Sequence, residues 1–350
     1  MGKGSVSMKI LTLNMNSHAR DFRREKLEQT IHFLAEYMQK YQIDLAALQE
    51  CGQTSAAGTW EYRIPGRYHD GGSGIALKED NAACLLAEAL AGAGETYDWT
   101  WAGVKQGYGM YDEGAAVFSR HPIRETDFFT VSRQDAFDNW KTRKVLGISV
   151  RIGGKLYWFY DVHLGWWKDE EEPSAEQMQR LREHVLTANA CGCAYPGGPK
   201  DVRGDFKAIA GGRKGGRKSI PCSCKIDYRL PEGDDTQSQE EAGIILLGDF
   251  NSPADVPGEG YDHMRSLGWQ DTFALAEQKD DGITVPGAID GWREDKVEGM
   301  RIDYIWTWQP MEVLSSRIVF SGKTEPVISD HFGVAVEIRE PSEPYGTEKE

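Results

Sequence analysis

The segment Gly243-Ile-Ile-Leu-Leu-Gly-Asp-Phe-Asn251 decides the fold of this chain. Its run of four aliphatic residues, followed by a glycine, predicts a short buried strand. Asp249 and Asn251 come directly after it at alternate positions, so their side chains point the same way from an extended segment. The sequence therefore predicts a strand that carries polar chemistry at its carboxyl end.

The same arrangement recurs along the whole chain. Other apolar segments also end in polar residues: Asn14, Glu50, Asp161 with His163, Asp303, and Asp330 with His331. An isolated residue of this kind usually caps a turn. In a layered α/β protein, however, strand ends converge on one edge, so we expect these side chains to gather there.

Periodicity elsewhere predicts the layers. Apolar residues along one face indicate helices over 22–41 and 174–189, and an Ala/Leu-rich run indicates a helix over 81–90. Apolar runs indicate strands over 8–15, 44–50, 113–119, 144–152, 155–162, 243–248, 301–306 and 332–338. Many short strands with few helices predict an α/β fold, a four-layer α/β/β/α sandwich with two packed mixed β-sheets.

Composition and charge narrow the function. Of the 350 residues, 40% are hydrophobic and 27% are charged, which is ordinary globular usage and excludes a disordered chain. The net charge of −15 disfavours a nucleic-acid partner, because phosphate neutralisation supplies most of that affinity. No apolar run is long enough for a membrane helix. The first residues carry no apolar leader, so we expect a cytoplasmic protein; the oligomeric state stays open.

A segment over 190–242 interrupts the pattern and is interpreted as an insertion within a single domain over 8–338. It is rich in glycine, and nine basic residues against three acidic ones lie between Gly197 and Arg229. Two Cys-x-Cys pairs occur in it: Cys191, Cys193, Cys222 and Cys224. Four thiolates could hold a structural Zn²⁺, while free thiols, or disulfides formed on oxidation, are the alternative. The last residues, 339–350, are predicted to be a disordered tail.

The polar strand ends carry the chemistry of phosphoester hydrolysis. Glu50, Asn14 and Asp330 offer hard oxygen ligands, which suit Mg²⁺ or Mn²⁺. His163 and His331 could donate to phosphoryl oxygens. Asp249 could orient or deprotonate a water, and Asp303 could fix the tautomer of His331.

These motifs resemble the endonuclease/exonuclease/phosphatase (deoxyribonuclease I-like) superfamily. The resemblance rests on Leu13-Asn14, Leu48-Gln-Glu50, Glu113-Gly-Ala115, Asp161-Val-His-Leu164, Gly248-Asp-Phe-Asn251, Arg301-Ile-Asp-Tyr304 and Ser329-Asp-His331, in that order. It implies that Glu50 is the main metal ligand, with Asn14 and Asp330 beside the metal. It also implies that Asp249 and Asn251 position the nucleophile and the phosphate, and that His331 pairs with Asp303. His163 would be a second phosphate-binding histidine, supported by Glu113. Arg143 would contact phosphate, or else be an exposed strand residue.

A narrower resemblance is to the maltose 6'-phosphate phosphatase-like branch. It rests on segments such as Tyr111-Asp-Glu-Gly114, Ser119-Arg-His-Pro-Ile123 and His163-Leu-Gly-Trp-Trp167. Indole faces stack on sugar rings, so four tryptophans near the motifs are candidate substrate-binding residues: Trp101, Trp166, Trp167 and Trp292. Packing in the core or at the rim is the alternative for each.

Three functions follow from the sequence. The first is a metal-dependent phosphomonoesterase that acts on a small phosphorylated sugar such as maltose 6'-phosphate. The second is a nuclease of the same superfamily, with the basic insertion contacting nucleic acid. The third, a non-catalytic binding module, is the weakest, because every metal and phosphate group that the superfamily needs is present.

Overall fold

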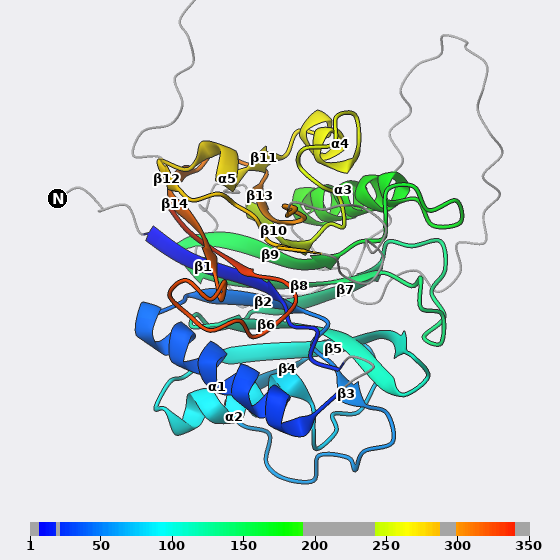
Figure 1. The fold of residues 1–350 in the computed structure, drawn as a ribbon, viewed down its shortest axis with the longest axis vertical. Coiled ribbons are helices and arrows are strands. Elements are labelled where there is room, and N and C mark those ends of the chain that lie inside the picture. Colours follow the sequence, from blue (N-terminus) through cyan, green and yellow to red (C-terminus); the bar gives the residue numbers. More distant parts are fainter. Residues whose placement is uncertain (1–6, 19–21, 192–241, 288–298, 340–350) are drawn as a thin grey trace, which may run out of the picture.

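The computed structural model describes residues 7–18, 22–191, 242–287 and 299–339, with the backbone alone at 189–191. Two β-sheets pack face to face, and helices cover the outer face of each (Figure 1). The predicted four-layer α/β/β/α sandwich is confirmed. Within the described residues, no helix has the length and apolar character needed to span a membrane.

The larger sheet has nine strands in the order β12-β14-β15-β1-β2-β6-β5-β4, and β3 pairs with β6. Its strands are β1 (Ser7–Asn14), β2 (Leu45–Gln49), β3 (Gln53–Thr54), β4 (Arg67–Asp70), β5 (Asp98–Gly107), β6 (Tyr111–Ser119), β12 (Gln278–Lys279), β14 (Glu312–Val319) and β15 (Gly333–Arg339). The first and last strands lie side by side at its centre: β1 runs antiparallel to β15 and parallel to β2. The sheet is therefore mixed, as expected.

The smaller sheet has six strands in the order β11-β13-β10-β9-β8-β7. They are β7 (Glu125–Thr130), β8 (Lys144–Ile152), β9 (Lys155–His163), β10 (Gly243–Asp249), β11 (Gln270–Asp271) and β13 (Asp303–Thr307). β10, the aliphatic strand that ends at Asp249, lies in the middle of this sheet. It runs parallel to β9 and antiparallel to β13.

The helices lie on the outer faces (Figure 1). α1 (Arg24–Tyr41) and α2 (Ala82–Gly92) cover the larger sheet, whereas α3 (Ser174–Cys191) and α4 (Gly260–Ser266) cover the smaller one. A short helix, α5 (Thr272–Leu275), packs beside β13 and β14. A cluster of buried hydrophobic side chains from both sheets fills the space between them, which fixes how the strand ends of the two sheets face each other.

Sequence reasoning missed three substantial strands: β5, β7 and β14. In β5, eight successive residues from Asp98 to Lys105 are buried, because α2 covers one face and the smaller sheet the other. Buried polar residues such as Asp98, Thr100 and Lys105 interrupt the apolar positions, so the strand shows neither a continuous apolar run nor a sustained alternation.

The ranges predicted for the tail and for the insertion each overlap an element of the structure by one or two residues. Arg339 still pairs with Ser7 in the β1–β15 ladder, so it belongs to the last strand and not to a tail. α3 continues through Cys191, beyond the predicted start of the insertion. The rest of that insertion, with Cys193, Cys222 and Cys224, lies outside the described residues, as does 340–350.

Candidate active site

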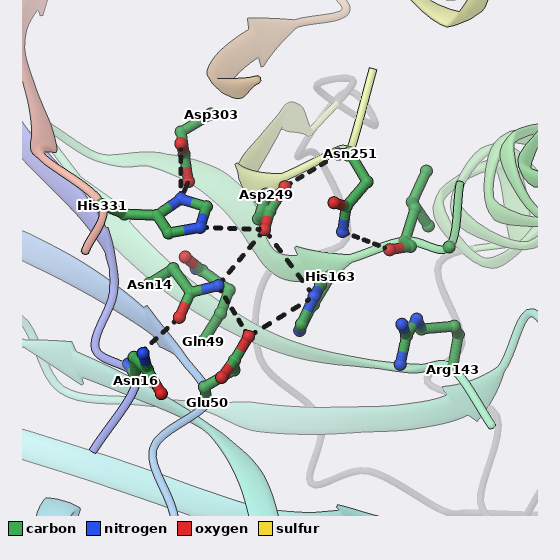
Figure 2. A network of polar contacts seen from close by, with 12 residues as sticks. Asn14, Asn16, Gln49, Glu50, Arg143, His163, Asp249, Asn251, Asp303 and His331 are labelled. Atoms are coloured by element: carbon green, nitrogen blue, oxygen red, sulfur yellow. Dashed lines mark hydrogen bonds and ion pairs between the residues drawn. The ribbon is translucent and has the colours of Figure 1, made fainter. Parts of the chain in front are cut away.

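Three neighbouring strands of the smaller sheet place their polar ends in one row. The ladder pairs Asp249 of β10 with His163 of β9 on one side and with Asp303 of β13 on the other. In the larger sheet, Asn14 of β1 is paired with Gln49 of β2. Because the two sheets face each other, these two rows meet at one edge of the sandwich (Figure 2).

The backbone at this edge is tightly constrained. Gly248 has a φ of +140°, and a Cβ there would lie 1.9 Å from the carbonyl oxygen of Val162. Only glycine allows β10 to approach β9 this closely just before Asp249. Glu50 and Asn251 adopt left-handed φ values of 46° and 47°, which non-glycine residues rarely do. Such strain occurs preferentially at functional sites.

Asn14 joins the two rows. Its Nδ2 donates to Glu50 Oε1 at 2.9 Å and to Asp249 Oδ2 at 3.2 Å, while its Oδ1 accepts from the backbone N–H of Asn16 at 3.1 Å. Figure 2 shows this amide between the two carboxylates. Two acids that are 199 positions apart in the sequence are thereby held within reach of one ligand.

His331 is held against Asp303. Its Nδ1 lies 3.0 Å from Asp303 Oδ2, and its Nε2 lies 3.9 Å from Asp249 Oδ2. Burial opposes protonation of this imidazole, but the carboxylates of Asp303 and Asp249 outweigh burial and raise the pKa of His331 to about 10. His331 is therefore a cation at neutral pH, with Nε2 directed into the site.

His163 faces the same space with its own Nε2. That atom lies 3.7 Å from Asp249 Oδ2 and 3.9 Å from Glu50 Oε1, whereas Nδ1 lies 3.8 Å from Glu113 Oε1. Burial, together with the nearby cations Arg143 and Lys105, holds the pKa of His163 well below its usual range. The site thus contains one neutral and one protonated histidine.

The acidic side chains at this edge lie so close together that their negative charges repel one another. Burial, and then the carboxylates of Glu113 and Asp330, raise the pKa of Glu50 to about 7. Burial, and then Asp303, raise the pKa of Asp249. A divalent cation would relieve this repulsion, and Glu50 and Asp330 supply the hard oxygens it prefers. The residues present therefore fit the predicted metal.

Asn14 fits the metal less well as it stands, since it turns its Nδ2 rather than its Oδ1 toward Glu50. A second group could also hold an ion, because ligand atoms of Asp249, Asp303 and His331 lie within 4.8 Å of one another. We favour the side of Glu50, whose side chain is 29% exposed and open to substrate, since Nδ1 of His331 is already bonded to Asp303.

Arg143 lies beside this network (Figure 2). It is 5% exposed, so it is not the exposed strand residue that the sequence left as an alternative. Its Nη1 reaches only two carbonyl oxygens, each at 3.4 Å, and its Nε has no hydrogen-bond partner among the described residues. It lines a small pocket with Glu50, Glu113 and His163. A buried guanidinium that is so poorly satisfied is suited to an anionic group.

The four candidate tryptophans differ in where they lie in the structure. The prediction for Trp101 is wrong: the side chain is 1% exposed, lies in the core under α2, and donates through Nε1 to the carbonyl oxygen of Cys51 at 2.7 Å. Successive residues of β5 face opposite sides of the sheet, and Trp101 faces the helices. Trp166 and Trp167 are partly exposed after His163. Trp292 lies outside the described residues.

Sequence reasoning missed two residues at this edge. Trp140 is 51% exposed; its ring lies 5.8 Å from that of Trp166, and its carbonyl oxygen accepts from Arg143. Its position three residues before Arg143 was the available signal. Lys105 is 6% exposed and lies 3.0 Å from Glu113. It could not be found, since β5 itself was not predicted.

Comparisons with known proteins agree with this arrangement. An endonuclease/exonuclease/phosphatase family protein from Leptotrichia buccalis C-1013-b is 26% identical, with a TM-score of 0.66 over 95% of this chain and 99% of that chain. The mannosyl-6-phosphatase Bt3783 from Bacteroides thetaiotaomicron VPI-5482 is 17% identical, with a TM-score of 0.57 over 95% and 99%. TDP2 from Caenorhabditis elegans is 12% identical, with a TM-score of 0.53 over 95% and 74%.

The last two similarities show the fold alone. No curated protein matches the sequence significantly. The sequence model described as "Endonuclease/Exonuclease/phosphatase family" matches residues 11–331, which is most of the chain. This protein therefore belongs to the endonuclease/exonuclease/phosphatase family.

Proposed function

We propose that this protein is a Mg²⁺-dependent phosphomonoesterase, also served by Mn²⁺, that releases phosphate from a small phosphorylated sugar. The observation that carries the proposal is the hydrogen-bonded bridge from Glu50 through Asn14 to Asp249. It joins a candidate metal ligand to a candidate base beside two histidines, and hydrolysis by water needs these groups together.

Each group has a distinct part in this proposal. Glu50, Asp330 and Asn14 would hold the cation, which polarises a phosphoryl oxygen when bound. Asp249 accepts a proton from the attacking water, and Asn251 keeps Asp249 in place, since the Asn251 N–H donates to Asp249 Oδ1 at 2.8 Å. His331, protonated beside Asp303, donates through Nε2 to the phosphoryl group. Arg143 and His163 bind the remaining phosphate oxygens.

Two features favour a small sugar phosphate as the substrate. The partly exposed indoles of Trp140 and Trp166 lie next to Arg143 and offer faces on which a sugar ring can stack. The net charge of −15 makes a long polyphosphate an unfavourable ligand. The name of Bt3783, mannosyl-6-phosphatase, adds a hexose 6-phosphate to the candidates beside maltose 6'-phosphate.

The test is a phosphate-release screen with Mg²⁺ over sugar phosphates, nucleotides and oligonucleotides. We expect release from at least one hexose or disaccharide phosphate. Glu50→Gln and Asp249→Asn should each lower kcat by at least about 100-fold, while Arg24→Gln, which changes an exposed helix residue, serves as the control. Cleavage of plasmid DNA that weakens steeply with salt, without sugar-phosphate turnover, would overturn the proposal in favour of a nuclease.

A further inference from the structure

A buried ion pair lies behind His163 and has no part in the proposal so far. Lys105 Nζ lies 3.0 Å from Glu113 Oε1, and the two side chains are 7% and 20% exposed. Removing a charge from water is energetically unfavourable, so a lysine at such a position needs a partner of opposite charge. Burial and Arg143 lower the pKa of Lys105, while Glu113 and Glu50 oppose that shift.

A β-bulge puts Lys105 there. In the β5–β6 ladder Gly103 pairs with Gly114, but the next pair is Lys105 with Glu113, so Val104 is skipped. In a regular ladder Val104 would lie opposite Glu113. Bulges next to active sites commonly redirect a side chain in this way. The backbone irregularity therefore places a cation, instead of an aliphatic group, beside this carboxylate.

The carboxylate of Glu113 lies between Lys105 and His163. The same oxygen, Oε1, is 3.0 Å from Lys105 Nζ and 3.8 Å from His163 Nδ1. Glu113 belongs to the larger sheet and His163 to the smaller one. The contact thus crosses the space between the sheets and reaches the imidazole from the side opposite Asp249.

We propose that Lys105 is a positioning residue, which holds the carboxylate of Glu113 in place so that Glu113 orients the imidazole of His163, with Nδ1 toward Glu113 and Nε2 toward the phosphoryl group. The role of His163 in this statement rests on the proposed function. Without the lysine, the carboxylate of Glu113 would lose its partner at 3.0 Å and would be free to turn away from His163. His163 would then lose the charged neighbour that orients its ring.

Kinetics test this proposal in the full-length protein. Partners that orient a catalytic or ligating histidine are typically worth about 10–100-fold. With p-nitrophenyl phosphate and Mg²⁺, Lys105→Met should lower kcat by about that factor and change KM less than about threefold. Lys105→Arg should recover most of the activity. The double variant Lys105→Met/Glu113→Gln should be no slower than Glu113→Gln alone, since both changes disable one unit.

Three kinetic results would overturn it. Unchanged kcat in a folded Lys105→Met protein leaves Lys105 with a packing role. A rise in KM with unchanged kcat makes it a substrate ligand. Additive losses in the double variant mean that it does not act through Glu113.

A readout without substrate separates this proposal from the proposed function. In protein labelled with ¹⁵N-histidine, each of the eight histidines of the chain gives Nδ1 and Nε2 signals. The signals that disappear in His163→Gln are assigned to His163. Lys105→Met should shift the His163 signals and leave the other seven in place; unchanged signals would refute the positioning role. If that variant does not fold, Lys105→Gln is measured instead.

Lys323→Met is the matched control. Lys323 Nζ also lies 3.0 Å from a carboxylate, that of Asp281, but on the surface. Both kcat and the His163 signals should stay as in the wild type. If the wild type turns over no substrate but the His163 signals shift in Lys105→Met as expected, the result counts against the proposed function and not against the role of Lys105.

Discussion

Asp303 decides the charge of its partner His331. Its carboxylate lies 3.0 Å from Nδ1 and is the main cause, against burial, of the raised pKa of that imidazole. The protonated form of His331 is therefore present at neutral pH and is lost only near pH 10. The same carboxylate also raises the pKa of Asp249.

Asp303→Asn should move the pH profile of kcat/KM toward acid. The loss of a neighbouring carboxylate typically lowers such an imidazole pKa by about one to three units, so the alkaline limb should fall by at least about one unit. The acid limb should move the same way, because the pKa of Asp249 falls too. Initial rates from pH 5 to 10 measure both limbs; an alkaline limb that stays in place would contradict this role of Asp303.

Asp161 provides a pH test of stability. It is 1% exposed, and its Oδ1 accepts from Gln49 Nε2 at 2.5 Å. Burial raises its pKa to about 7. Since this value lies above the unfolded one, near 4, the stability carried by the neutral carboxyl is complete below pH 4 and is lost as the pH rises to 7.

Asp161→Asn keeps a neutral group at every pH. Relative to the wild type, its free energy of unfolding should therefore rise by up to about 4 kcal/mol between pH 4 and pH 8, at about 1.4 kcal/mol for each pKa unit. Urea titrations at the two pH values give the difference. If the variant and the wild type differ in free energy of unfolding by the same amount at pH 4 and at pH 8, Asp161 is ionised in the folded protein at both.

Among single residues, the sequence predicted that the strand-end side chains gather, and Asn14, Glu50, Asp249 and His331 do lie together, while their catalytic roles stay predictions. They could be picked out because polar residues that follow apolar runs stand out locally. Lys105 and the orientation of Trp101 depend on pairing across β5 and β6, which no local pattern records. The prediction for Trp101 failed for that reason.

Among the elements, β10 shows how a strand can be predicted from the residues at its two ends. Ile244 to Leu247 have no alternation, yet the glycines and polar residues that bound them mark the strand. β5 carries a glycine and a lysine within the strand, so its limits do not stand out, and it was missed. Gly248 is the more demanding of the two glycines that bound β10, because the carbonyl oxygen of Val162 occupies the place of a Cβ.

Gly248→Ala should destabilise the protein by about 4 kcal/mol or more, which is the range of severe backbone and packing conflicts. Gly258 is the matched control, with a φ of +75° and no atom within 4 Å of a Cβ. Gly258→Ala should cost only about 1–2 kcal/mol, the penalty of a left-handed alanine. Thermal unfolding measures both; equal losses would mean that the contact with Val162 relaxes at little cost.

In the whole molecule, the ladder between β1 and β15 brings the two ends of the described part of the chain together. Ser7 pairs with Arg339, and Ser329 Oγ donates to the carbonyl oxygen of Asn14 at 2.7 Å beside the site. The four layers could be predicted from the numbers of strands and helices. The adjacency of the first and last strands could not, because it depends on contacts more than 300 positions apart.

A circular permutant tests this adjacency. A linker of about four residues, a length typical of hairpin loops, should join Arg339 to Ser7. New ends between Gly153 and Gly154 fall in the turn between β8 and β9. The permutant should fold and keep activity within about tenfold of the wild type, which corresponds to about 1.4 kcal/mol. Ending the natural chain at Phe332 should abolish folding; a folded truncated protein would show that β15 is dispensable.

The β1–β15 pairing also bears on folding during translation. β1 is translated more than 300 residues before its neighbour β15, so the middle of the larger sheet stays open until β15 has emerged from the ribosome. His331, which immediately precedes β15, emerges at nearly the same time. A nascent chain that still lacks this segment therefore cannot assemble the complete group of side chains.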